Sequence, residues 1–207
     1  VGSNSGCMGG RLRDVPSFVI NFRLPWGVLV FYSEIPKKFL PFLHSCYDPF
    51  FKGTLPSLDD MAPGERTLAR FLLGDDDHKN KTLKIVPVVV KGPWIVQSVA
   101  GGKPAIVGTK MPLQYIYGPK IGNQAEYLEA DLDVVGSAVA RKICSVVASY
   151  TQGVTIDLGF VVEGQKEDEL PEQMLLASRL HGIDPVSAPA LPPMKDMFMI
   201  NEGSNSD

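Results

Sequence analysis

The sequence has few of the residues that build disulfide scaffolds and metal sites. Its 207 residues include three cysteines and three histidines. Cys7, Cys46 and Cys144 are far apart and have no CxxC spacing, so neither a disulfide framework nor a zinc site is expected. The histidines are scattered along the chain. Such a chain fits the cytoplasm or another reducing compartment.

Concentrated charge and long apolar runs are scarce as well. The formal net charge is −3, and no run of lysine or arginine is longer than two. This argues against a nucleic-acid-binding surface and against attraction to anionic membranes through charge alone. No stretch approaches the ~18 apolar residues of a membrane-spanning helix, and the first residues do not resemble a signal peptide. Hydrophobic residues make up 44% of the chain, which is enough for a globular core.

The two ends of the chain have the composition of linkers. The letters GSNS occur at 2–5 and again at 203–206, and a proline-rich stretch precedes the second copy. Small polar residues of this kind are typical of flexible linkers. We therefore expect a linker over 1–14, a single domain over 15–183 and a Pro-rich tail with a linker over 184–207. The chain then reads as a domain from a longer or tandem protein, although ordinary frayed termini look the same.

Hydrophobic periodicity predicts a mixture of strands and helices between these ends. The predicted strands are 17–25, 26–35, 82–90, 94–100, 104–118 with bends at Gly108 and Pro112, 125–135 and 154–164. The predicted helices are 37–48, 65–73, 137–150 and 170–182, and 75–81 is expected to be a solvated turn. Most connections between strands are short, so the sheet should be mainly antiparallel. The expected fold class is α+β, with one curved sheet gripped by the long helix 137–150.

Three carboxylates share one face of the strand 125–135. They are Glu129, Asp131 and Asp133, and Asp157 lies on the polar face of the next long strand. Carboxylates from adjacent strands can bind a hard cation, but no histidine joins them in a pattern typical of a catalytic metal site. The interpretation of these acids as a solvated sheet face needs fewer assumptions than a metal site, because opposite charges on neighbouring strands stabilise a sheet. The basic residues expected to oppose the acids are Arg23, Lys84 and Lys91.

The apolar side of the predicted sheet is the more informative one. The long helix carries a large apolar stripe with Val139, Ile143 and Val146, and beside it a stripe of small residues. Large residues on a sheet against small residues on a helix are typical of tight packing, but they also leave space for a ligand. The candidate ligand-binding residues are Phe18, Ile20, Phe22, Trp26, Trp94, Tyr115, Tyr117, Leu128, Leu132, Ala140, Cys144, Ala148, Ile156, Leu158 and Phe160.

Four short motifs occur in an order and spacing that resemble a known plant family. They are the Gly-Asp segment at 74–77, the Lys-Gly-Pro-Trp turn at 91–94, the Tyr-Leu-Glu-Ala-Asp-Leu-Asp strand at 127–133 and the Glu-Leu-Pro-Glu segment at 169–172. The chain is similar to the C-terminal domain of the Enhanced Disease Resistance 2 family. In the plant proteins this domain follows a pleckstrin-homology domain and a START lipid-transfer domain. The resemblance implies work with lipids at membranes and a START-like helix-grip architecture.

These observations leave three functions open. The leading hypothesis is non-catalytic binding of an apolar ligand, lipid or carotenoid-like, between sheet and helix, in lipid sensing or transport. The alternative is a protein-interaction or scaffold domain with a solid core, and a metal-dependent enzyme using the four carboxylates is third. The expected partner is an apolar small molecule or lipid, and peripheral membrane contact is compatible with it. No nucleic acid and no cofactor are expected, and the oligomeric state is left open.

Overall fold

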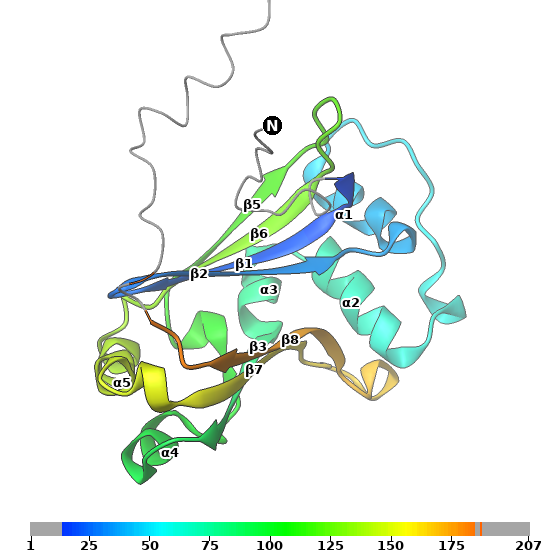
Figure 1. The fold of residues 1–207 in the computed structure, drawn as a ribbon. Helices are drawn as coiled ribbons and strands as arrows, with labels where there is room; N and C mark the ends of the chain where they lie inside the picture. Colours follow the sequence, from blue (N-terminus) through cyan, green and yellow to red (C-terminus); the bar gives the residue numbers. More distant parts are fainter. Residues whose placement is uncertain (1–13, 185–186, 188–207) are drawn as a thin grey trace, which may run out of the picture.

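The strands form two four-stranded sheets that pack against each other, not one. The computed structural model describes residues 14–184 and 187. The predicted linker over 1–14 and the predicted tail over 184–207 therefore lie almost wholly outside the described residues. Figure 1 shows the two sheets as separate layers, with helices between them and at one end.

The first sheet has the strand order β2-β1-β6-β5. It consists of β1 (Ser17–Leu24), β2 (Gly27–Glu34), β5 (Leu113–Gly118) and β6 (Tyr127–Asp133). Leu24 pairs with Gly27, so Pro25 and Trp26 form a tight turn between the predicted strands 17–25 and 26–35. β1 and β6 run parallel, and the other neighbours run antiparallel.

The second sheet has the strand order β4-β3-β7-β8, and all its neighbours are antiparallel. It consists of β3 (Leu83–Lys91), β4 (Ala105–Ile106), β7 (Thr155–Val162) and β8 (Gln173–His181). The predicted strand 104–118 is thus divided between the two sheets, with the 3-10 turn η4 (Val107–Thr109) at its first predicted bend.

The predicted helix 170–182 is wrong, because most of this segment is β8. Its leucines, methionine and alanine favour a helix, but β7 forms a ladder with the part of the segment from Gln173 to His181. From Leu176 to His181 the side chains alternate between half-buried and exposed, which is the period of a strand. Arg179 on the exposed side forms a two-pronged ion pair with Asp157 of β7, at 2.7 and 2.8 Å. Pairing with a neighbouring strand therefore outweighs local helix propensity here.

Three helices fill the side of the molecule where the sheets diverge (Figure 1). They are α1 (Leu40–Tyr47), which follows the 3-10 turn η2 (Lys37–Phe39), α2 (Pro63–Leu73) and α3 (Asp76–Thr82). The first two match the predicted helices at 37–48 and 65–73. The predicted solvated turn at 75–81 is wrong, because α3 forms there with Asp75 as its N-cap and with Lys79 fully buried.

The core lies between the two sheets and α2. The rings of Phe31 and Phe160 meet across the sheets with their centres 5.6 Å apart. Phe71 of α2 makes edge-on contacts with Phe18 at 5.9 Å and with Tyr115 at 6.2 Å. Because each sheet covers the apolar face of the other, neither needs a long helix to cover it.

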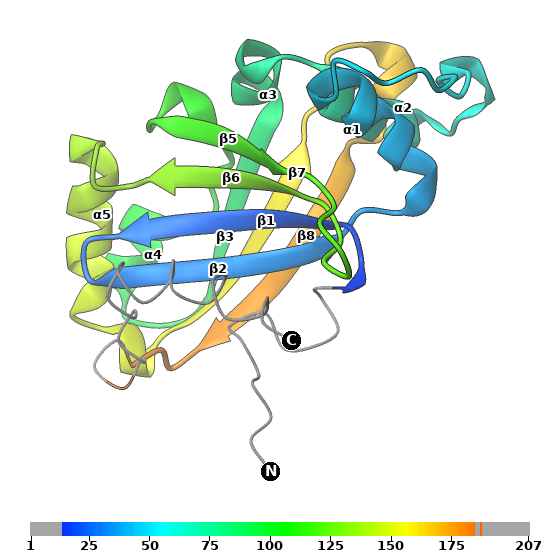
Figure 2. The same ribbon diagram turned by 90° about the horizontal axis from the view of Figure 1, so that it is seen from above.

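Two helices lie at the opposite end of the molecule from α1 and α2 (Figure 2). They are α4 (Trp94–Ala100), which connects β3 to β4, and α5 (Ala138–Ala148), which connects the two sheets. The predicted strand 94–100 is wrong, because this segment is α4. The predicted helix 137–150 is confirmed as α5, but it has no fully buried side chain. A single sheet gripped by this helix is therefore corrected to two sheets with α5 at their end.

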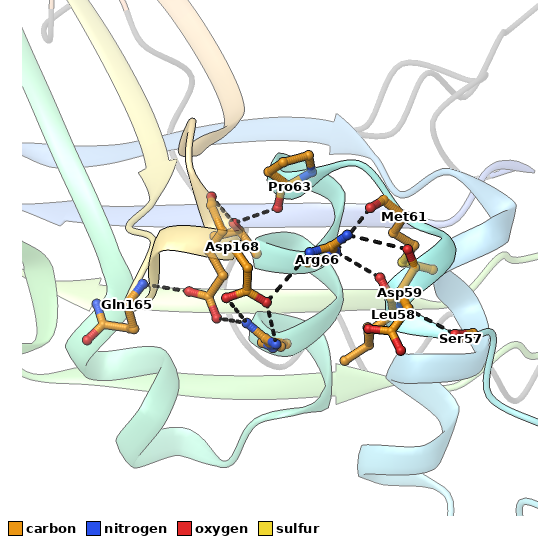
Figure 3. A network of polar contacts seen from close by, with 11 residues as sticks. Ser57, Leu58, Asp59, Met61, Pro63, Arg66, Gln165 and Asp168 are labelled. Carbon is orange, nitrogen blue, oxygen red and sulfur yellow. Dashed lines mark hydrogen bonds and ion pairs between the residues drawn. The ribbon is translucent and has the colours of Figure 1, made fainter.

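Ion pairs tie α2 to the connection between β7 and β8 (Figure 3). Arg70 binds Asp168 at 3.0 Å and also binds Glu169, which is buried. Arg66 donates from Nε to the carbonyls of Leu58 and Met61, at 2.9 and 3.1 Å. The acidic end of the last family motif thus has a structural role in this chain.

Candidate functional site

An apolar groove lies between α4 and α5. The two helices contact each other, and Figures 1 and 2 both show them together at one end of the molecule. The groove has a volume of about 380 Å³ and is open to solvent. Its lining is apolar apart from one lysine, and consists of Val99 from α4 with Ala138, Val139, Lys142, Ile143 and Val146 from α5.

Local sequence features place both walls of the groove. The hydroxyl of Ser137 accepts a hydrogen bond from the backbone of Ala140 at 3.3 Å and so caps the start of α5. The lining residues of α5 then recur at the spacing of one helix face. At the end of α4, Gly102 has a φ of +76° and donates its N–H to the carbonyl of Pro87 at 2.9 Å. This left-handed position favours glycine, and it ties α4 back to β3.

Large apolar side chains are exposed on the two groove helices and on the segments that lead to them. Trp94 begins α4 and is 75% exposed, and Val139 on α5 is 72% exposed. Val90 at the end of β3 and Val135 before α5 are exposed as well. The turn between β1 and β2, which contains the half-buried Trp26, lies at the same end of the molecule (Figures 1 and 2). A cluster of exposed apolar groups of this kind indicates a binding surface more often than a structural one.

The groove lies in a region of the chain without acidic residues. Between Asp77 and Glu126 there are seven lysines and no aspartate or glutamate, and residues 134–156 have two basic residues and no acidic one. Four exposed cations belong to these segments near the helices, and within the described residues none of them forms an ion pair. They are Lys91, Lys103, Arg141 and Lys142. The segments that carry the two groove helices are therefore basic although the whole chain carries −3.

The candidate ligand-binding residues of the strands lie in or against the core between the sheets. The fully or nearly fully buried ones are Phe18, Ile20, Tyr115, Leu128, Leu132, Leu158 and Phe160, and Phe22, Tyr117 and Ile156 pack against them. The candidates of the helix, Ala140, Cys144 and Ala148, are half-buried on α5. Burial raises the pKa of the Cys144 thiol to about 11, so this thiol is neutral at pH 7. The structure thus separates the helix residues from the strand residues that sequence reasoning grouped with them.

The sequence contained a signal for the groove, but from the sequence alone that signal was placed against the sheet. Val139, Ile143 and Val146 stand out as a stripe in the sequence, and they line the groove on one side. Val99, Ala138 and Lys142 were missed, the first because 94–100 was predicted to be a strand. Of the candidate residues, Trp94 and the small stripe of α5 belong to the two groove helices.

A second pocket of about 340 Å³ lies where β2, η2, α2 and β8 meet. Phe18 and Phe71 of the core line it, but its lining also includes Ser33, Glu34, Gln173 and the ion pair of Lys38 with Glu65. Of the candidate residues, only Phe18 lines it. A pocket with this mixed lining is less suited to an apolar ligand than the α4–α5 groove.

The four carboxylates of the metal hypothesis are not brought together. Glu129, Asp131 and Asp133 lie on β6 of the first sheet, whereas Asp157 lies on β7 of the second and is occupied by Arg179. Burial and the hydrogen bond with Asp131 raise the pKa of Glu129. Among the described residues, no group of three or more histidine, cysteine, aspartate and glutamate side chains has the arrangement of a metal site.

Of the basic residues expected opposite these acids, Lys84 and Lys91 lie in the second sheet, and only Arg23 lies opposite one of them. Lys84 belongs to the second sheet and pairs with Glu163 at 3.2 Å and with Glu172 at 2.5 Å. Arg23 is in register with Asp133, but no ion pair joins them within the described part of the chain. The acidic face is thus supported by an amide, since Asn21 donates to Glu129 at 3.2 Å.

Comparisons with known proteins agree with the resemblance seen in the motifs. The model of the family "Protein ENHANCED DISEASE RESISTANCE 2, C-terminal" matches residues 8–184. A relative from Arabidopsis thaliana, "Protein ENHANCED DISEASE RESISTANCE 2-like", is 33% identical over 129 residues, which are 62% of this chain and 17% of that protein. The match thus spans a small part of the relative's length. No solved structure matches the chain, and no helix in the described residues is long and apolar enough to cross a membrane. The chain belongs to the family of the Enhanced Disease Resistance 2 C-terminal domain.

Proposed function

We propose that this domain is a non-catalytic binding module that holds the apolar part of a lipid or carotenoid-like molecule in the α4–α5 groove, in lipid sensing or transport. The observation that carries the proposal is the groove itself, with a volume of about 380 Å³ and a single polar side chain in its lining. This volume lies in the usual range of small-molecule sites, roughly 300–1,000 Å³. The site moves from the space between sheet and helix, which α5 does not enclose, to the space between two helices.

Burial of apolar surface supplies the affinity in this proposal. Each methylene of an acyl chain that leaves water contributes about 0.8 kcal/mol. Ile143 and Val146 offer such a chain a half-buried apolar wall, with Val139 at its exposed end. A shallow groove of this kind accommodates part of a chain, so the ligand keeps contact with solvent or with a membrane.

The single lysine of the lining defines the polar end of the ligand. Lys142 lies on α5 one residue before Ile143, and no ion pair holds it among the described residues. A lysine ammonium is a point charge that binds carboxylate or phosphate. A fatty acid or a phospholipid therefore fits the groove better than an uncharged hydrocarbon.

The proposal is tested with a fluorescent fatty acid below its micellar concentration. Val139→Glu places a charge in the groove lining, and Ile121→Glu is its matched control, because Val139 and Ile121 are 72% and 70% exposed. Ile121 lies in the loop between β5 and β6, away from the groove (Figure 2). We expect Val139→Glu to weaken binding about tenfold or more and the control to bind as the unchanged chain does.

Two results would overturn the proposal. The first is that the unchanged chain binds neither the fatty acid nor any apolar molecule that native mass spectrometry or organic extraction can detect. The second is equal affinity of the two variants. Either result would leave the scaffold function, with a protein partner, as the better explanation of the exposed apolar side chains.

A further inference from the structure

We infer that the α4–α5 end of the molecule docks on the surface of a bilayer that contains anionic lipids. The inference rests on the proposed function, because the groove that would hold a lipid chain is lined by the same two helices. It adds the partner, the orientation of the domain and the residues that make the contact.

The apolar part of this face has the composition of a membrane-interface anchor. Trp94 projects from the first turn of α4 with 75% of its surface exposed. An indole carries a large apolar body and one N–H donor, and this combination favours the boundary between headgroups and acyl chains. Val139 and Val90 add exposed aliphatic surface from α5 and from the strand that leads to α4.

The charged part of the face complements an anionic surface. Lys91 precedes Trp94 by three residues, Lys103 follows α4 by three, and Arg141 and Lys142 lie on α5. All four are exposed, and the segments that carry them contain no acidic residue. In a chain of net charge −3, this local excess of cations orients the domain toward a negative surface. Charge alone is insufficient for stable binding to a membrane, and the exposed tryptophan and valines supply the apolar contribution.

The two helices are suited to lie on a bilayer and not to cross it. They span Trp94–Ala100 and Ala138–Ala148, which is far shorter than the ~20 apolar residues of a spanning helix. Cations at the margin of an apolar centre are the pattern of interfacial helices. An acidic protein is the alternative partner for these cations, but binding to such a protein would not require lipid.

The test uses the 207-residue chain and sedimentation with vesicles. One set of vesicles is pure phosphatidylcholine, and the other contains phosphatidylserine as well. We expect binding to the anionic vesicles only, and we expect it to fall as salt is added, because salt screens exposed charges. Trp94 fluorescence should shift to shorter wavelength on binding, and Trp94→Phe should remove that shift.

Two pairs of variants separate the contributions. The charge reversal Arg141→Glu with Lys142→Glu should lower binding about tenfold or more, whereas Lys52→Glu with Lys120→Glu, exposed lysines away from this end, should not. Trp94→Ala should lower binding, and Ile121→Ala should not.

Three results would overturn the inference: no binding to either kind of vesicle, equal binding to both kinds, or equal loss in the two charge-reversed variants. If the chain binds the soluble fatty acid but no vesicles, the inference of a docking face is wrong and the proposed function of the groove stands. If the chain binds vesicles through these cations but binds no soluble fatty acid, the docking face stands and the proposed groove function fails.

Discussion

The ammonium group of Lys79 lies 5.0 Å from the centre of the Tyr47 ring, inside the protein, and no carboxylate of the described residues forms an ion pair with it. Its Nζ donates to the carbonyl of Gly74 and lies 3.7 Å from the sulfur of Cys46. The ring of Tyr115 is 5.8 Å away on another side. The polar α3 segment, with its run of aspartates and lysines, thus becomes part of the interior through one lysine held by aromatic rings.

Replacement of Lys79 should depend on size more than on charge. Lys79→Met keeps the length of the side chain and removes a buried charge, so we expect the free energy of unfolding to change by less than about 1.5 kcal/mol at pH 7. Lys79→Ala leaves a cavity under the two rings and should lose about 2–4 kcal/mol. Urea unfolding of both variants measures this. Equal losses in the two variants would show that the charge itself stabilises the fold.

The same lysine should make stability depend on alkaline pH. Burial lowers the pKa of Lys79, and the nearby Cys46 and Asp76 oppose that effect in part. Because the folded pKa lies below the unfolded value, the unfolded chain binds more protons between the two values, and stability rises with pH in that window. The stability of the unchanged chain relative to Lys79→Met should therefore increase as the pH rises from 7 toward about 10. A difference that stays constant with pH would contradict the direction of this pKa.

Arg70 should be essential for the attachment of α2. Its removal in Arg70→Ala leaves the buried carboxylate of Glu169 without its cation, which should cost about 3 kcal/mol or more. Asp168 is the exposed partner of the same arginine, so Asp168→Asn should change stability little. Thermal unfolding of the two variants compares them, and similar losses would mean that the buried pair is not the important contact.

Glu129 should destabilise the folded protein at neutral pH. Its pKa is raised by burial and by Asp131, so the folded state binds the proton more tightly than the unfolded chain does, and stability falls as the pH rises through this window. Glu129→Gln resembles the protonated acid. The variant should be more stable than the unchanged chain at pH 7, and the two should converge below about pH 4. A variant that is less stable at pH 7 would show that the charged form is the favoured one.

Several elements of the fold were predictable from local signals. β1 and β2 lie within the predicted strands 17–25 and 26–35, and α5 lies within the predicted helix 137–150, where Ser137 caps the first turn. Errors occur where a neighbouring element decides the outcome. β8 is a strand because β7 has a free edge. The segment 94–100 contains β-branched residues that favour a strand, yet it forms a helix between Pro93 and Gly101.

The position of the site could not be predicted for the same reason. An apolar stripe on a helix shows that one face avoids water, but not what covers that face. The sequence indicated a sheet under Val139, Ile143 and Val146. In the structure the two sheets cover each other, and the stripe faces α4 and solvent instead.

The proposal that an apolar ligand lies between α4 and α5 is tested most directly by photo-crosslinking. A fatty acid that carries a diazirine near the end of its chain is bound to the 207-residue chain and irradiated, and the modified peptides are identified by mass spectrometry. The account predicts that modification concentrates on residues 94–100 and 138–148. Modification centred on the second pocket, at residues 33–39 and 173–175, or spread evenly over the surface, would contradict it.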